Sequence, residues 1–222
     1  MKQCLKICNV YWMSGIFSII FIIILITRPT PSYFQGRFKD IQFPKNSEIC
    51  LDNRMLATSS YTEPGSTYEK TQISYKYSEG KYQQSSLIAV ELNTMSLLKS
   101  KDVIVNPKCI KTTTLSRSNR YYISRDLFEK DQNIKEFTID SNYALYHIDL
   151  LPFILCWEKS NNLRHPRNVS VWDPKLSRVM FCKISEKVVE QNNKMIEFKT
   201  DYRVINVKYK LLEGCWQIVD IQ

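Results

Sequence analysis

The chain has 222 residues, of which 24% are charged and 44% hydrophobic, and its formal net charge is +9. This is the composition of an ordinary globular protein, and it excludes collagen-like and low-complexity classes. The basic residues are scattered without a run of four and no nucleic-acid-binding module is recognisable, so we expect no nucleic-acid partner. The charge is instead compatible with attraction to an anionic glycan or lipid surface.

The first predicted element is an uncharged run at residues 10–27, VYWMSGIFSIIFIIILIT. A helix of this length spans about 27 Å, close to the roughly 30 Å hydrocarbon core of a bilayer. Tyr11 and Trp12 at its start suit the headgroup region, and the proline-rich stretch that follows makes a poor cleavage site. The run therefore predicts an uncleaved transmembrane signal-anchor helix; a cleaved signal and a buried core helix are the alternatives.

Charges on the two sides of this run do not decide its orientation, because basic residues flank both ends. The N-terminal tail, residues 1–9, is short, and long C-terminal domains cross membranes largely regardless of their charge. We therefore expect a single-pass membrane protein with a short cytoplasmic tail and its domain outside the cytoplasm. That location is the secretory pathway, the cell surface or a viral envelope, or the periplasmic side in a bacterium.

After the predicted anchor, residues 28–48 read as a stalk, because Pro29, Pro31 and Pro44 discourage helix. Residues 49–222 are enough for one domain with a substantial core. The predicted organisation is thus a tail, an anchor, a stalk and one domain.

Strand-like patterns rich in β-branched and aromatic residues dominate this domain. Ile73, Tyr75 and Tyr77 alternate with polar residues, and Gly80 supplies a turn after them. The apolar stretch around Pro152 reads as an edge strand or a break. Further strands are predicted at 87–92, 102–105, 120–124, 136–140, 143–150, 169–172 and 178–184.

Helical patterns are fewer. In 185–195, Val188 and Met195 fall near one side of a helix, and weaker helices are predicted at 91–100 and 124–131. Toward the C-terminus an alternating strand changes parity near Val204, which predicts a bulge or bend. A turn at 212–214 and a returning strand at 215–221 complete the pattern. The expected fold is α+β, mainly β: a strongly curved antiparallel sheet with one or two short helices.

Five cysteines lie in the predicted domain without any metal-ligand spacing, and the whole chain has only two histidines. We therefore expect no metal site. In an oxidising compartment widely spaced cysteines predict disulfides, and an odd number leaves one thiol over. In a reducing compartment they would be ordinary small apolar residues. The disulfide candidates, whose connectivity the sequence leaves open, are Cys50, Cys109, Cys156, Cys182 and Cys215.

Two surface features are also predicted. Asn168-Val169-Ser170 is the only glycosylation sequon, in a polar stretch, and makes Asn168 a glycosylation candidate. Aromatic and arginine side chains carry much of the energy of protein interfaces. The candidate interaction surface comprises Tyr121, Tyr122, Arg164, Arg167 and Trp172. We expect Trp172 to be exposed. The alternative for the aromatic residues is that they pack in the core.

No catalytic motif is present: the chain has no G-x-S-x-G, H-E-x-x-H or phosphate-binding glycine loop. His147 alternates with apolar neighbours and reads as a structural histidine rather than a catalytic base. We expect no cofactor. The favoured function is protein–protein interaction by a membrane-anchored domain, as a subunit, receptor or assembly factor. The alternatives are a membrane-anchored enzyme acting on glycans or lipids and a β-barrel or cone that binds an apolar ligand.

Overall fold

The structure is a computed structural model, and it describes ten ranges of the chain. These are residues 48–51, 53–61, 70–91, 94–118, 121–129, 134–140, 144–157, 167–190, 192–212 and 215–222. The predicted tail, the predicted anchor and the predicted stalk up to residue 47 lie outside them, whereas Glu48, the last residue of that stalk, begins the first strand. Within the described ranges, no helix has the length and apolar character needed to cross a bilayer.

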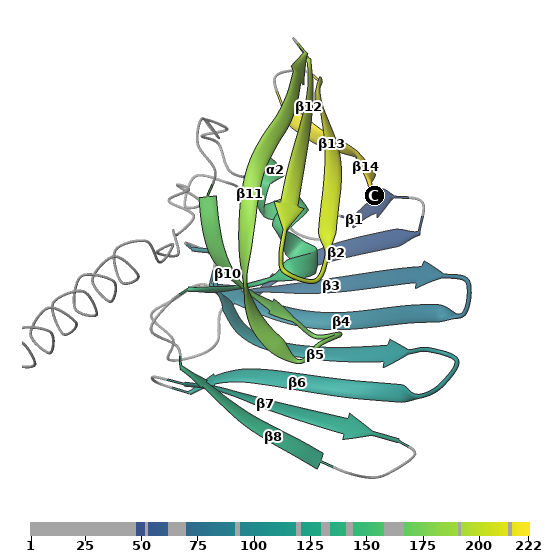
Figure 1. Cartoon of the computed structure of the whole chain (residues 1–222), viewed down its shortest axis with the longest axis vertical. Helices are drawn as coiled ribbons and strands as arrows, with labels where there is room; N and C mark the ends of the chain where they lie inside the picture. Colours follow the sequence, from purple (N-terminus) through teal and green to yellow (C-terminus); the bar gives the residue numbers. More distant parts are fainter. Residues whose placement is uncertain are drawn as a thin grey trace, which may run out of the picture. The chain divides into compact units, whose positions relative to one another are not determined.

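Eight consecutive strands form the first sheet as an antiparallel meander, in which each strand pairs with its neighbour in sequence (Figure 1). Antiparallel neighbours can be joined by connections as short as the two residues between β3 and β4. Gly80, with φ of +56°, makes the turn between β3 and β4 in a conformation that L-residues with a side chain rarely adopt. The strands are β1 (Glu48–Leu51), β2 (Arg54–Tyr61), β3 (Lys70–Glu79), β4 (Tyr82–Glu91), β5 (Leu97–Val105), β6 (Ile110–Ser118), β7 (Tyr121–Phe128) and β8 (Ile134–Asp140).

Six strands form the second sheet, in the order β14-β13-β12-β11-β10-β9. β9 and β10 are parallel, and the other neighbours are antiparallel. A parallel pair needs a crossover, which includes η2 and α2 here. The elements are β9 (Leu145–His147), η2 (Ile148–Leu150), α2 (Leu151–Trp157), β10 (Arg167–Asp173), β11 (Arg178–Glu190), β12 (Asn193–Lys199), β13 (Val204–Leu212) and β14 (Cys215–Ile221).

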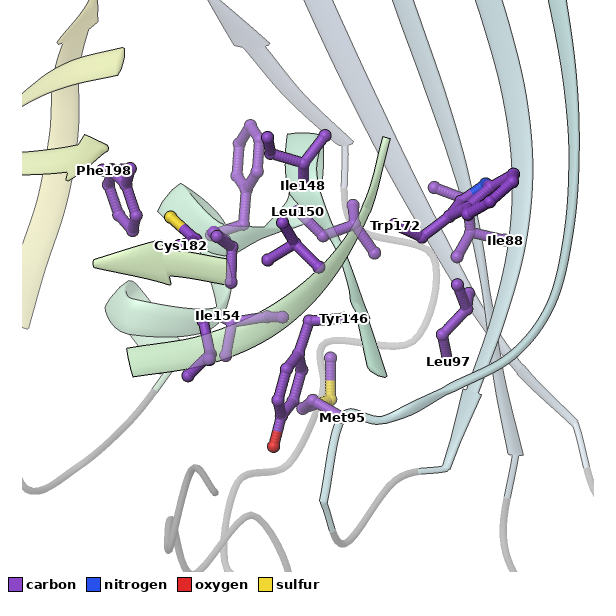
Figure 2. Packing of buried hydrophobic residues seen from close by; sticks show 14 of the residues in the cluster. Ile88, Met95, Leu97, Tyr146, Ile148, Leu150, Ile154, Trp172, Cys182 and Phe198 are labelled. Carbon is purple, nitrogen blue, oxygen red and sulfur yellow. The ribbon is translucent and has the colours of Figure 1, made fainter. Parts of the chain in front are cut away.

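One buried hydrophobic cluster takes side chains from both sheets and from α2. Ile88 and Leu97 come from the first sheet, Phe153 from α2, and Trp172 and Phe198 from the second sheet; each is at most 1% exposed. Figure 2 shows the Trp172 ring directed toward Ile88. Burying aromatic and branched side chains of this size is the main favourable term in folding. The fold is thus mainly β, with a strongly curled antiparallel sheet and one short helix in its described part.

The register of the first sheet aligns its inward-facing side chains in rows that cross the strands. One row is apolar at its centre, with Ile73 beside Ile88. The next row is polar: Ser86 lies beside Asp102, Asp102 beside Thr113, and Thr113 beside Asp126. All four of these side chains are buried. Because buried polar groups need partners, this row requires complementary groups from elsewhere in the fold.

The predicted hairpin around Gly80, the strands at β7, β8, β10 and β11, and the final pair β13–β14 are confirmed. The three predicted helices are wrong. Residues 185–190 form the end of β11 and residues 193–195 the start of β12, residues 97–100 form the start of β5, and residues 124–128 form the end of β7. In each case pairing with neighbouring strands overrides a weak helical pattern.

Two further predictions need correction. The parity change near Val204 is a turn between β12 and β13, rather than a bulge inside one strand. Thr200 N–H donates to Arg203 O (2.9 Å), and Arg203 N–H donates to Thr200 Oγ1 (3.1 Å). The apolar stretch around Pro152 is helical and forms α2, with Pro152 in its first turn, where its missing N–H costs nothing.

Candidate functional site

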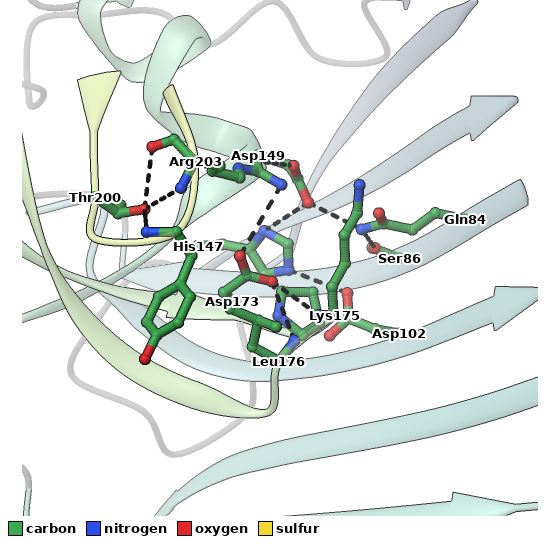
Figure 3. Close-up of polar contacts among 12 residues, drawn as sticks. Gln84, Ser86, Asp102, His147, Asp149, Asp173, Lys175, Leu176, Thr200 and Arg203 are labelled. Atoms are coloured by element: carbon green, nitrogen blue, oxygen red, sulfur yellow. Dashed lines mark hydrogen bonds and ion pairs between the residues drawn. The ribbon is translucent and has the colours of Figure 1, made fainter. Parts of the chain in front are cut away.

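The buried polar row meets a charged group on the second sheet. His147, at the end of β9, donates from Nε2 to Asp102 Oδ1 on β5 across 3.0 Å, and both side chains are 0% exposed. The other ring nitrogen, Nδ1, lies 3.9 Å from Asp149 Oδ2. Figure 3 shows the imidazole between these two carboxylates. We call Asp102, His147, Asp149 and Arg203 the polar cluster.

Arg203 completes the cluster from the turn between β12 and β13. Its guanidinium donates to Asp149 Oδ1 across 2.8 Å and lies 4.0 Å from Asp173. Gln84 Nε2, on β4, donates to the other oxygen of Asp149 across 2.9 Å (Figure 3). Asp149 therefore accepts hydrogen bonds from residues of both sheets. A buried carboxylate needs such partners, because an unpaired buried charge is strongly destabilising.

The charges of the cluster stabilise one another. Burial opposes the imidazolium of His147, but the charge and hydrogen bond of Asp102, with Asp149 and Asp173, outweigh it and raise the pKa of His147. Burial likewise opposes the carboxylate of Asp149, but Arg203 and His147 outweigh it and lower the pKa of Asp149. These shifts favour His147 as imidazolium and Asp149 as carboxylate.

This geometry favours a structural role for His147. A general base must reach the proton that it abstracts, whereas the His147 side chain is fully buried and faces a carboxylate on each side. Asp102 and Gln84 belong to the first sheet, and His147, Asp149 and Arg203 to the second or its connections. The cluster therefore joins the two sheets, in agreement with the interpretation of His147 as a structural residue.

The far end of the first sheet differs from this covered part. Residues 134–138 of β8 are all exposed, so side chains on both faces of the strand contact solvent. Ile134 is 67% and Phe137 43% exposed, and Leu127, opposite Ile134 on β7, is 41% exposed. In the part of the chain that the structure describes, β8 pairs with β7 alone.

Among the described ranges, no strand pairs with the outer edge of β8. Glu129 N–H donates to Ile110 O, so residue 129 and every second residue before it direct their backbone groups toward β6. Ser124 and Asp126 then face β8, where they lie opposite Phe137 and Lys135. By the same alternation, residues 134, 136 and 138 direct N–H and C=O away from β7. We call this the β8 edge.

Of the four predicted interaction residues that the structure describes, Tyr122 and Trp172 are buried. Tyr121 is 52% exposed, whereas Tyr122 is 1% exposed and donates to Leu97 O. The expectation that Trp172 is exposed is wrong: it is 0% exposed, because β10 lies inside the second sheet and directs this ring into the core. Arg167 is half-buried on β10, and Arg164 lies outside the described residues.

Asn168 is half-buried on β10, opposite Lys183, and its glycosylation stays a prediction. Cysteines 50, 109, 156 and 182 are thiols in this structure, and the side chain of the fifth candidate, Cys215, is not described. Burial raises the pKa of both Cys156 and Cys182 to about 12, which disfavours their reactive thiolate form. Disulfide pairing stays a prediction.

Among the described residues, no three His, Cys, Asp or Glu side chains are grouped so that they could hold a metal ion. Comparison with protein-family models, curated proteins and solved structures finds no match to the chain. Sequence reasoning missed the roles of Asp102 and Arg203, which lie 45 and 56 residues from His147. The apolar neighbours of His147 were the only sequence feature that indicated a buried site.

Proposed function

We propose that this chain is a single-pass membrane-anchored binding protein whose β-rich domain, outside the cytoplasm, captures a protein partner. The uncharged run at residues 10–27 supports the anchor, and the long C-terminal part supports the orientation. The observation that carries the binding function is the open β8 edge.

The partner contributes an extended segment that adds to β8 as a further strand. An exposed sheet edge with unused N–H and C=O groups is the surface that strand addition requires. Apolar side chains on both faces of β8, Ile134 and Phe137, would contact alternate side chains of the added strand. Natural edges are usually blunted by charge, proline or a bulge; this strand carries the charges of Lys135 and Glu136, but it has no proline and pairs with β7 without a register shift.

Charge narrows the class of partner. Lys135 is exposed on β8, and the chain as a whole carries +9. The carboxylate of Glu136 is already engaged by Arg125, whose Nε lies 2.9 Å from it. An extended segment that combines apolar residues with acidic ones is therefore favoured, and electrostatic attraction would accelerate its association.

The test uses a proline at an outward-facing position. Thr138→Pro removes an N–H that does not bond to β7, whereas Thr138→Val keeps it and preserves the side-chain shape. The full-length chain is affinity-purified from its native membrane with each substitution, after circular dichroism has shown that both variants fold. We expect a partner that Thr138→Val retains and Thr138→Pro loses, and whose capture weakens at high salt.

Equal capture by the two variants would contradict strand addition at β8. If the chain forms a homodimer that Thr138→Pro abolishes and Thr138→Val retains, the segment that adds to β8 belongs to a second copy of this chain and not to another protein. A partner that binds both variants and is lost on substitution elsewhere would place the interface on another surface.

A further inference from the structure

A cavity of about 180 Å³ lies against the polar cluster, on the side of Asp149. Its walls come from β2, β3, the turn after β10, the turn before β13 and the end of β14. Pro152, Ile205 and Ile221 line part of it. Its charged and phenolic lining consists of Arg54, Tyr75, Tyr77, Asp149, Lys175 and Arg203.

Among the side chains of this lining, positive charge exceeds negative charge, with three cationic side chains and one carboxylate side chain; Gln222, the last residue of the sequence, also lines the cavity. Arg203 already binds that carboxylate, which also accepts from Gln84. The Arg54 guanidinium donates to Asn53 Oδ1 (3.2 Å) and to the carbonyl of Ile221 (3.0 Å), both neutral groups. Among the described residues, no carboxylate lies within 4.0 Å of the cationic groups of Arg54 and Lys175.

Hydrogen bonds fix the turn that carries Lys175. This residue lies in the turn after β10, where Asp173 Oδ1 accepts its backbone N–H (2.8 Å) and that of Leu176 (3.4 Å). From the first sheet, Lys111 Nζ donates to the carbonyl of Pro174 (3.1 Å) and so fixes the same turn. A binding group that is held by its surroundings loses little entropy when a ligand binds.

Aromatic rings position the two cations that lack a carboxylate. The Lys175 ammonium lies 4.6 Å from the ring centre of Tyr82 and 5.5 Å from that of Tyr77. The Arg54 guanidinium lies 4.9 Å from the Tyr77 ring centre. Cation–π contacts hold such groups without neutralising them. The ring of Tyr77 thus contacts both cations.

We propose that this cavity binds a small organic anion through a carboxylate or phosphate group held by Arg54 and Lys175, with Arg203 behind them. Its volume is below the roughly 300–1,000 Å³ of pockets for drug-sized ligands, so it admits a single acidic group with a short apolar body. The apolar part contacts Ile205 and Ile221, and the acidic group accepts charge-assisted hydrogen bonds.

The titration of Lys175 agrees with this assignment. Partial burial of its ammonium group lowers the pKa of Lys175, although the residue as a whole is exposed; Asp149 opposes the shift, and Arg203 adds to it. A bound anion would offset the repulsion among the three cations. Carboxylates farther out are engaged locally: Tyr77 O–H donates to Glu79, and Gln222 Nε2 donates to Asp220 across 2.7 Å.

The test measures binding of two anions to the full-length chain by isothermal titration calorimetry at constant ionic strength. Hexanoate represents an apolar carboxylate and inorganic phosphate represents a phosphate group, while hexanamide is the uncharged control. We expect hexanoate or phosphate to bind, hexanamide not to bind, and Arg54→Gln with Lys175→Gln to weaken binding by about tenfold or more, because each substitution removes a charged donor.

Lys101→Gln is the matched control, since Lys101 is exposed on β5 and absent from the cavity lining, and it should leave the affinity unchanged. The single variant Lys175→Gln is measured as well. Because Lys175 is an exposed turn residue, this variant should fold, and the proposal can still be tested if the double variant does not. Preference between the two anions identifies the acidic group. Binding of neither anion, equal binding of hexanamide, or unchanged affinity in the variants would overturn the proposal.

Discussion

Asp102 on β5 and Ile134 on β8 lie in one sheet and have opposite surroundings. The charged residue is 0% exposed and the apolar one 67% exposed. The difference follows from what covers each strand: His147 and Trp172 of the second sheet bury the β4–β5 part, whereas nothing described covers β8. Position across the sheet therefore decides burial here more than residue type does. The covered part of the sheet contributes most to stability, and we propose that the open edge binds the partner.

The largest expected effect on stability comes from comparing one aromatic residue in the covered part with one at the open edge. Trp172→Ala removes a fully buried ring and should lower the free energy of unfolding by about 4 kcal/mol, because it leaves a cavity in the core. Phe137→Ala, at a ring that is 43% exposed, should cost about 1 kcal/mol or less. Denaturant unfolding of the full-length variants measures both values. Equal losses would show that the two parts are equally covered.

Breaking the bond between the sheets should have the next largest effect. Asp102→Ala leaves buried His147 without its 3.0 Å partner and should cost about 3 kcal/mol, as is typical when one member of a buried pair is removed. Asp102→Ala combined with His147→Ala should cost less than the sum of the single changes. Strict additivity in this double-mutant cycle would mean that the pair does not interact.

Two members of the polar cluster, His147 and Asp149, predict a pH dependence of stability. The pKa of His147 is raised above 6.5 in the fold, so its contribution is complete below pH 6.5 and is lost as pH rises through the raised pKa. The pKa of Asp149 is lowered from 3.8, so its contribution is present above pH 3.8 and is lost as pH falls through the lowered pKa. Together these groups stabilise the fold most between pH 3.8 and 6.5.

The direction of this pH dependence is checked by measuring the unfolding free energy of the wild type and of His147→Gln from below pH 6.5 to well above it. The difference in unfolding free energy between them should shrink as pH rises above 6.5. A difference that stays constant or grows with pH would show that His147 is not protonated in the folded protein.

The smallest effect is expected at the open edge. Ile134→Ser should change the free energy of unfolding by less than about 0.5 kcal/mol, because the side chain has few contacts to lose. It should nevertheless reduce self-association, since an exposed apolar edge strand favours pairing between copies. Analytical ultracentrifugation of the wild type and the variant measures this. A loss of stability comparable to that of Asp102→Ala would mean that Ile134 is packed against another segment.

Local chemistry made part of this fold predictable. Gly80 marks its hairpin because glycine adopts positive φ readily, and alternation at Ile73, Tyr75 and Tyr77 marks β3. Pro152 misled the prediction of a strand break, since proline also suits the first turn of a helix, which is where it lies. The opposite error occurred at residues 185–195, where a helix was predicted and cross-strand pairing between β11 and β12 decided the conformation.

The candidate sites were less accessible to sequence reasoning. His147 was identified as structural from its apolar neighbours, but its partner Asp102 is 45 residues away on the other sheet, and no local pattern connects them. Lys175 and Arg203 were not singled out, because each lies in a turn whose position depends on the complete fold. The exposure of β8 depends on the end of the sheet order, which a strand pattern alone does not specify.

Amide hydrogen exchange along β8, resolved by NMR on the full-length chain, tests the open edge most directly. We predict alternating protection: the amides of Lys135, Phe137 and Ile139, directed toward β7, exchange slowly, and those of Glu136 and Thr138 exchange close to the rate of unprotected amides. Protection of Glu136 and Thr138 without a partner would contradict this account, because it would show that another segment of the chain already occupies the edge.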